Sequence, residues 1–193
     1  MIPAQLLLLT GAPATGKSWL ARRLAQHYGA CCCSKDEIKE QLFDVLGAGD
    51  AQWSRRLSDA SFALLFRFAA RLLAPRRILL LEGNFRPGEH EAALMAQLSG
   101  SAVALAQILC RADAATRAAR LAARAADTTR HRGHRDQVPG AAPPGAAAPG
   151  ETEFLELPGP RWVFNSELPG EGSDDHEWLA LCRHIDDWQA GRC

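Results

Sequence analysis

The chain has 193 residues, with 22 basic and 22 acidic side chains and 47% hydrophobic residues. This length favours one domain with a sizeable core. No apolar stretch is long enough to cross a membrane, the first ten residues lack a charged secretory leader, and the six cysteines do not follow a disulfide framework. We therefore expect a single domain over residues 1–193 of a reduced, cytoplasmic protein.

The net charge is zero overall but uneven along the chain. Residues 151–193 carry ten acidic and three basic side chains, a net −7, so residues 1–150 carry the balancing +7. The basic side chains are almost all arginines, which suit planar contacts with phosphate. This distribution favours an anionic ligand and does not by itself imply nucleic acid.

Short apolar runs alternate with helical periodicity. The predicted strands are residues 5–9, 30–33, 77–81, 102–110 and 162–165. The predicted helices are residues 17–28, 35–46, 52–73, 89–98, 113–126 and 174–189. This alternation predicts an α/β fold in which helices cover both faces of a parallel sheet.

The sequence G-A-P-A-T-G-K-S at residues 11–18 lies between the first strand and the first helix, and it fits the phosphate-binding pattern G-x-x-x-x-G-K-[ST]. Its glycines allow successive N–H groups to face one concavity, its lysine reaches the β- and γ-phosphates, and its serine ligates Mg²⁺. The predicted nucleotide-binding residues are Gly11, Ala12, Pro13, Ala14, Thr15, Gly16, Lys17, Ser18 and Trp19. The alternative is a glycine-rich turn with an exposed lysine.

The second predicted strand contains three consecutive cysteines, which we interpret as small hydrophobes of a buried strand. Asp36 follows it, at the sheet edge that carries the phosphate-binding loop, where a carboxylate can take the proton of an attacking hydroxyl. Lys39 shares a helix face with Asp36 and could hold an anionic group of an acceptor. Alternatively, Ser34 and Asp36 cap the helix and Lys39 is solvated.

Polar residues also follow the third predicted strand. Glu82 occupies the position from which a carboxylate can hold Mg²⁺ through water, although its longer side chain could reach the acceptor instead. Asn84, Phe85 and Arg86 offer polar, stacking and cationic contacts to an acceptor. The alternative for Asn84 and Phe85 is a turn followed by a core aromatic residue.

The fifth predicted helix places Arg120 and Arg124 on one face, and an Arg/His cluster that begins at Arg130 follows it. Arginines that close over a transferring phosphoryl group neutralise its developing charge, so we predict catalytic roles for Arg124 and Arg130. Residues 139–150 are only Pro, Gly and Ala, and we predict a mobile lid and loop over residues 127–150. The alternative is a solvated basic helix face.

These pieces together resemble the P-loop kinases of the AAA_33 and zeta-toxin-like group, which includes chloramphenicol phosphotransferase-like and polynucleotide-kinase-like domains. The matching segments are G-A-P-A-T-G-K-S at 11–18, S-K-D-E-I-K at 34–39, L-E-G-N-F at 81–85, the arginines at 120 and 124, and R-H-R-G-H at 130–134. Lys35 before the acid, Glu82 in place of Asp, and the Pro/Ala/Gly insertion depart from the pattern.

The resemblance implies a P-loop NTPase three-layer fold with a five-stranded parallel sheet in the order 2-3-1-4-5 and a helical lid. It also implies ATP and Mg²⁺ as cosubstrates and transfer of the γ-phosphoryl group to a hydroxyl. Asp36 is then the expected base and Lys17 the phosphate clamp, with Arg120 near the adenine and Arg124 near the phosphates.

We expect an ATP-dependent kinase that phosphorylates a hydroxyl of a small molecule. A polynucleotide 5′-hydroxyl kinase would use the same residues, but no basic track interleaved with aromatics is evident for a single strand. A zeta-toxin-type kinase that acts on a nucleotide sugar is a further alternative. From another class, a nucleotide-sensing module with weak ATPase activity remains open, as does the oligomeric state.

Overall fold

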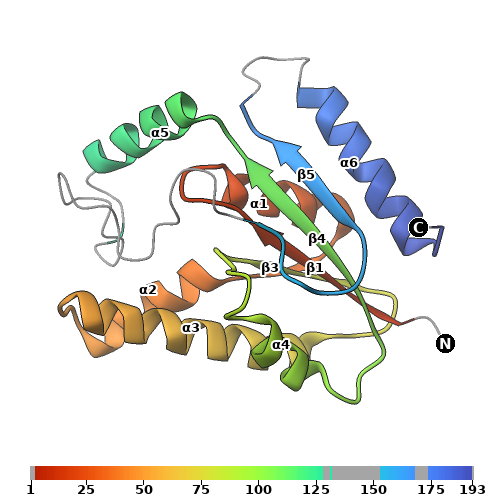
Figure 1. Cartoon of the computed structure of the whole chain (residues 1–193), viewed down its shortest axis with the longest axis horizontal. Coiled ribbons are helices and arrows are strands. Elements are labelled where there is room, and N and C mark those ends of the chain that lie inside the picture. Colours follow the sequence, from red (N-terminus) through yellow and green to blue (C-terminus); the bar gives the residue numbers. More distant parts are fainter. Residues whose placement is uncertain (1–2, 128–130, 132–152, 168–173, 193) are drawn as a thin grey trace.

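The computed structural model describes residues 3–127, 131, 153–167 and 174–192. Its centre is a parallel sheet in the order β2-β3-β1-β4-β5, which confirms the predicted order (Figure 1). The strands are β1 (Ala4–Thr10), β2 (Cys31–Ser34), β3 (Ile78–Glu82), β4 (Val103–Arg111) and β5 (Arg161–Asn165). The helices are α1 (Lys17–Tyr28), α2 (Lys35–Leu46), α3 (Ala51–Leu72), α4 (Glu91–Leu98), α5 (Ala114–Ala126) and α6 (Asp174–Gln189).

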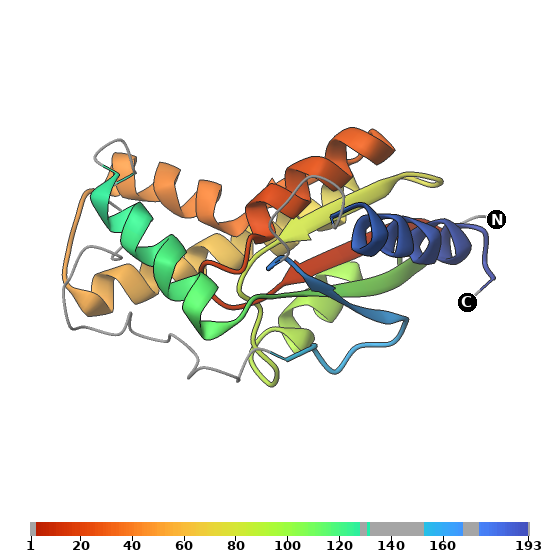
Figure 2. The same cartoon turned by 90° about the horizontal axis from the view of Figure 1, so that it is seen from above.

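Helices cover both faces of the sheet, so the fold has three layers (Figures 1 and 2). Alternate residues of β1 point to opposite faces. Leu7 and Leu9 pack with α1 and α6, whereas Leu6 and Leu8 pack with α3 and α4. Because β1 is buried on both sides, its sequence is continuously apolar, as expected for a central parallel strand.

The register of the sheet brings the carboxyl ends of β1, β2 and β3 to one edge. Leu9 of β1 pairs with Glu82 of β3, and Ser34 of β2 also pairs with Glu82. The residues that follow these strands therefore emerge side by side at the carboxyl edge, where α/β proteins bind ligands. The phosphate-binding loop (residues 11–18) and the β2–β3 edge (residues 34–39 and 82–86) are neighbours there.

Strand β2 is an outer strand, and this corrects the prediction of a buried cysteine strand. Cys31 is exposed, and Cys32 and Cys33 are only partly buried, because β2 pairs with β3 on one side alone. Partial burial still raises the pKa of Cys32 to about 12 and that of Cys33 to about 11. Both thiols are therefore protonated at neutral pH.

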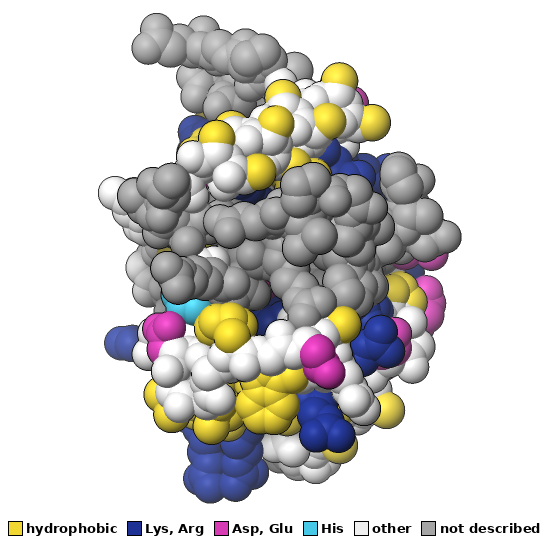
Figure 3. Space-filling view, turned by 90° about the vertical axis from the view of Figure 1, so that its left-hand side faces the viewer, with side chains coloured by type: hydrophobic (Ala, Val, Ile, Leu, Met, Phe, Trp, Pro, Cys, Tyr) yellow, Lys and Arg dark blue, Asp and Glu magenta, His cyan; other side chains and the backbone are white. Residues whose placement is uncertain are grey.

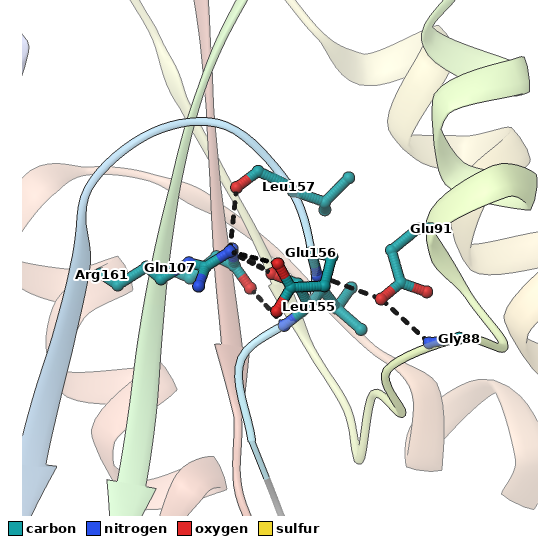
Figure 4. Close-up of polar contacts among 7 residues, drawn as sticks. All are labelled: Gly88, Glu91, Gln107, Leu155, Glu156, Leu157 and Arg161. Carbon is teal, nitrogen blue, oxygen red and sulfur yellow. Dashed lines mark hydrogen bonds and ion pairs between the residues drawn. The ribbon is translucent and has the colours of Figure 1, made fainter.

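The segment that precedes β5 is fixed to the sheet by side chains (Figure 4). The Gln107 side chain in β4 donates to the Leu155 carbonyl and accepts from the Leu155 N–H, at 3.0 and 2.9 Å. A carboxylate oxygen of Glu91 accepts from the N–H groups of Gly88 and Glu156, both at 3.1 Å. These contacts hold residues 155–157 over the α3–α4 face and so fix where β5 begins.

The α2–α3 turn and α5 lie at the same end of the molecule (Figure 1). Hydrophobic side chains are exposed there among basic and acidic ones (Figure 3). Val45 and Leu46, at the end of α2, are 80% and 54% exposed. Helix α5 has no fully buried residue, so it contributes little to the core.

Most of the predicted lid, residues 127–150, lies outside the described residues, as does the Pro/Ala/Gly-rich loop. Within the described part of the chain, no helix is both long and apolar enough to span a membrane.

Candidate active site

The phosphate-binding loop joins β1 to α1 through left-handed backbone positions. Gly11, Ala14 and Gly16 have φ values of 150°, 65° and 88°. The Ala12 carbonyl closes the turn, because it accepts from the Thr15 hydroxyl at 2.8 Å and from the Lys17 ammonium at 2.9 Å. These hydrogen bonds within the loop help to fix its shape.

Side chains from three other segments hold the outer carbonyls of this loop. The Thr15 carbonyl accepts from the Cys110 thiol at 2.9 Å and from the Ser166 hydroxyl at 2.6 Å. Arg117 and Arg120 of α5 donate to the carbonyls of Pro13 and Ala14, at 3.1 and 3.3 Å. Because a peptide's C=O and N–H point in opposite directions, fixing these carbonyls outside directs the N–H groups that follow them to the inside.

Lys17 is the electrostatic centre of the site. Burial lowers the pKa of its ammonium, whereas the charges of Glu82 and Asp36 raise it. Arg124 of α5 lowers it further, as a like charge. Glu82, Asp36 and Arg124 therefore all act on Lys17, although they come from the end of β3, α2 and α5.

Glu82 is the most deeply buried acid of this group, at 2% exposure. Burial raises the pKa of its carboxyl, and the Lys17 ammonium opposes that shift. The Ser34 hydroxyl donates to Glu82 Oε2 at 2.6 Å, which also lowers the pKa. The Ser34 hydroxyl therefore binds Glu82, and it does not form a capping hydrogen bond at the N-terminus of α2.

Asp36 lies in the first turn of α2, and its side chain is 48% exposed. The Lys35 ammonium donates to its Oδ1 at 3.1 Å. Lys39, one turn later, donates to the Ser54 hydroxyl of α3 at 3.0 Å. Lys39 is thus half-buried between two helices, while Asp36 is accessible to a ligand.

The three residues after β3 that were predicted to contact an acceptor lie in different environments. Asn84 is half-buried, and Arg86 forms an ion pair with Glu89 at 3.0 Å on the surface. Phe85 is 2% exposed, and its ring packs in the core with Phe62 and Phe66. The ring of Phe85 is therefore part of the floor beneath the loop, as the alternative reading of a core aromatic residue anticipated.

The arginines of α5 have different contacts. Arg120 donates to the hydroxyl and carbonyl of Ser166, at 2.9 and 2.6 Å, as well as to the loop. Arg124 lies one turn further along and is close enough to affect Lys17. Arg130 lies outside the described residues. Trp19, after the loop, is 42% exposed and carries Arg23 over its ring at 5.2 Å.

Sequence reasoning missed the residues that support the loop from outside. Cys110 ends a predicted strand, and Ser166 follows one, so their positions at the carboxyl edge were a signal. Their bonds to Thr15 depend on strand order, which places β4 beside β1 and β5 beside β4. The ion pair of Lys35 with Asp36 was not expected either, although Lys35 stood out as a departure from the motif.

The sequence predicts that Ser18 and Glu82 hold Mg²⁺. Ser18, the second residue of α1, is exposed, and the charge of Glu82 acts on Lys17, the residue before Ser18. Among the described residues, no group of three or more His, Cys, Asp or Glu side chains could hold a metal ion. One hydroxyl and one carboxylate nevertheless fit Mg²⁺, which usually keeps waters and takes its other ligands from substrate phosphates.

Comparison with protein families gives one match, which spans more than half of the chain. The sequence profile of the AAA_33 family, described as an AAA domain, matches residues 6–142. No curated protein sequence matches the chain.

Solved structures share the whole fold. A protein from Chloroflexus aurantiacus, described as a candidate kinase, is 30% identical, with 95% of this chain and 99% of that chain covered and a TM-score of 0.82. A sugar kinase from Janibacter is 11% identical, with 97% and 98% covered and a TM-score of 0.60. The APS kinase of Mycobacterium tuberculosis, solved with AMPPNP and APS, is 16% identical, with 96% and 99% covered and a TM-score of 0.56.

Proposed function

We propose that this chain, which belongs to the AAA_33 family, is an ATP-dependent kinase that phosphorylates a hydroxyl of a small-molecule acceptor. The observation that carries the proposal is that the phosphate-binding loop, Glu82 and the start of α2 with Asp36 meet at one edge of the sheet, where Glu82, Asp36 and Arg124 all act on the charge of Lys17. Phosphoryl transfer needs a cation for the phosphates, an acid for the metal, a base for the acceptor, and a second cation for developing charge. Lys17, Glu82, Asp36 and Arg124 would fill these four roles in that order.

The phosphate-binding loop would hold the ATP phosphates with its N–H groups and Lys17. Ser18 and Glu82 would hold Mg²⁺, which neutralises charge on the phosphates when it is bound. The raised pKa of Glu82 reflects a buried carboxyl with too little compensating charge, and a cation bound beside it would favour its ionised form.

Asp36 would serve as the general base. The acceptor oxygen forms a bond to the γ-phosphorus while the bond from that phosphorus to the β–γ bridging oxygen breaks. The proton of the acceptor hydroxyl passes to Asp36, and ADP leaves. The exposed carboxylate of Asp36 can be reached by an acceptor at the β2–β3 edge.

Acceptor recognition would involve Lys39, Asn84 and Arg86. Lys39 follows Asp36 in α2, and the other two follow β3, whose last residue Glu82 pairs with Ser34 at the end of β2. Phe85 would support this surface from beneath, because its ring is in the core. On the nucleotide side, Arg124 and Arg130 would stabilise charge on the transferring group, and Trp19 and Arg120 would flank the nucleotide.

The similar solved structures support a small acceptor. Two are named as kinases of small molecules, a sugar and APS, and one of them contains AMPPNP, an ATP analogue. The five described cysteines carry free thiols, which fits a cytoplasmic location.

The experiment is ATP consumption with Mg²⁺ against a panel of sugars, sugar acids, nucleosides, nucleotide sugars, antibiotics and 5′-hydroxyl oligonucleotides. We expect one class of small molecule to raise turnover and to yield a phosphorylated product by mass. Asp36→Asn should lower that turnover by about 100-fold or more, because the base is lost. Lys17→Ala should abolish it, and Arg67→Met, which removes an exposed charge from α3, should leave it unchanged.

The outcome also separates the alternatives. Turnover that requires an oligonucleotide would identify a polynucleotide kinase, and turnover that requires a nucleotide sugar would identify a toxin-type kinase. ATP hydrolysis that no acceptor stimulates, with equal rates in Asp36→Asn and wild type, would overturn the kinase proposal in favour of a nucleotide-sensing module.

A further inference from the structure

Lys35 is an unusual lysine for an active-site neighbour, because its side chain is only 6% exposed. Its Cβ packs beside Gly83, where an added methyl group would come within 3.3 Å of it. Its ammonium lies 5.7 Å from the centre of the Phe62 ring. The stem of Lys35 is therefore held between the loop after β3 and helix α3.

The Phe62 ring is itself fixed. It packs with the rings of Phe66 and Phe85, and the His90 ring lies 4.0 Å away, centre to centre. The Nδ1 atom of His90 accepts from the Arg86 N–H at 2.9 Å, and burial lowers the pKa of this imidazole, so it is neutral. The surface that Lys35 rests on is thus a rigid aromatic cluster.

The ion pair between Lys35 and Asp36 is asymmetric. The ammonium donates to Asp36 Oδ1 at 3.1 Å, yet the Asp36 side chain is 48% exposed. A buried partner with few accessible rotamers thus holds one oxygen of a carboxylate that is half exposed. Rotation of the carboxylate about its last torsion would break this contact.

The pair is poorly explained as a stabilising interaction. Withdrawing an ammonium from water costs free energy, and the contacts to the Phe62 ring and to an exposed carboxylate return only part of it. Apolar side chains of similar size often replace such groups without loss of stability. A charge kept at this position is better explained by what it does to Asp36.

We infer that Lys35 is a positioning residue, whose ammonium holds the Asp36 carboxylate in the orientation in which it takes the proton of the acceptor hydroxyl. This inference rests on the proposed kinase function. Lys35 acts through Asp36 and contacts neither ATP nor the acceptor.

A double-mutant cycle tests the inference. Lys35→Met keeps the length and apolar contacts of the side chain and removes its charge. We expect it to lower kcat about tenfold in the wild-type background, with the KM for ATP and for the acceptor within about twofold. In the Asp36→Asn background the same substitution should change the residual kcat by less than about twofold. Lys35→Arg should recover part of the lost kcat.

Folding is followed separately by thermal unfolding and by binding of a non-hydrolysable ATP analogue, which Lys35→Met should leave unchanged. Arg67→Met is the control for loss of a positive charge, because Arg67 is exposed on α3. If Lys35→Met unfolds the chain, the cycle is repeated with Lys35→Gln, whose amide can still donate to Asp36 but carries no charge.

Three results would overturn the inference. One is an equal loss of kcat in both backgrounds, which would show that Lys35 acts independently of Asp36. Another is a rise in the acceptor KM with unchanged kcat, which would make Lys35 an acceptor contact. The third is no change at all. Each of these three results can be interpreted only if turnover by the wild-type chain depends on Asp36. If the wild-type chain shows no such turnover, the kinase proposal is overturned, and this inference with it.

Discussion

In the phosphate-binding loop, the carbonyls of Pro13, Ala14 and Thr15 accept hydrogen bonds from side chains of β4, α5 and the residue after β5. At the β2–β3 edge, side chains bind side chains. Ser34 donates to Glu82, and Lys35 donates to Asp36. The first region is shaped through the main chain, and the second through charges and hydroxyls over an aromatic cluster.

This difference matters for function. A loop built from main-chain groups binds what every nucleotide shares, its phosphates, and the identity of most side chains within it is free to vary. An edge built from side-chain charges can be changed residue by residue, which suits the recognition of one acceptor. The two halves of the site should therefore fail in different ways when they are substituted.

The largest expected effect is in the main chain of the loop. In Gly11→Ala, the new Cβ would lie 2.3 Å from the Cys110 carbonyl oxygen, at a φ of 150° that side chains rarely adopt. We expect the loss of ATP binding, measured by calorimetry, and a free energy of unfolding lowered by about 3 kcal/mol or more.

Gly29→Ala is the matched control for this substitution. Gly29 also has a positive φ, 58°, but an added Cβ meets no atom within 4 Å. It should cost about 1 kcal/mol of stability and leave ATP binding intact. Similar ATP affinities in the two variants would contradict the view that the backbone of the loop forms the site.

The sequence was sufficient to predict the strand, turn and helix around the phosphate-binding loop because this segment is local. The eight residues 11–18 specify the turn, and the apolar runs on either side place it between a strand and a helix. The alternation of strands and helices, with the resemblance, also led to the observed strand order. Element boundaries agree with the structure to within two residues.

The β2–β3 edge was only partly predictable because its contacts join distant residues. Asp36 and Glu82 could be placed at the same edge, since both follow parallel strands. That Phe85 turns into the core depends on Phe62 and Phe66, which α3 brings from elsewhere in the chain. Likewise, no local pattern distinguishes a buried Lys35 from a solvated one.

A smaller effect, dependent on pH, is expected at Glu82. Because its pKa is raised from about 4.5 in the folded state, the folded chain binds its proton more tightly than the unfolded chain does. Glu82 therefore costs no stability below pH 4.5, and its contribution becomes unfavourable as pH rises from there to the raised pKa. Glu82→Gln should consequently gain stability relative to wild type over that window.

Denaturant unfolding of both proteins between pH 4 and pH 8 measures this gap. As pH rises, the difference in unfolding free energy between Glu82→Gln and wild type should grow by about 1.4 kcal/mol for each unit by which the pKa of Glu82 is raised. Above the raised pKa the difference should stay constant. Glu153→Gln, at an exposed position, should show no such trend. Kinase activity should fall in Glu82→Gln even though stability rises, and a stability gap that is independent of pH would contradict the buried-acid account.

A pair of serine substitutions separates the two halves most directly, because one serine hydroxyl donates to a group in each half. Ser166→Ala removes the 2.6 Å bond to the Thr15 carbonyl and the acceptor of the 2.9 Å bond from Arg120. The Cys110 thiol still donates to the Thr15 carbonyl, and Arg120 still donates to the carbonyls of Ala14 and Ser166. Ser34→Ala removes the 2.6 Å bond to Glu82, which is buried and loses its hydroxyl donor. We expect a loss of about 0.5–1 kcal/mol of unfolding free energy for Ser166→Ala and about 1–3 kcal/mol for Ser34→Ala at neutral pH.

Ser99→Ala gives the baseline loss of unfolding free energy for an exposed serine, because the Ser99 hydroxyl donates to a carbonyl at the exposed end of α4. Equal losses for Ser166→Ala and Ser34→Ala would mean that the carbonyl and the carboxyl depend equally on their serines, and the contrast between a main-chain half and a side-chain half would not hold.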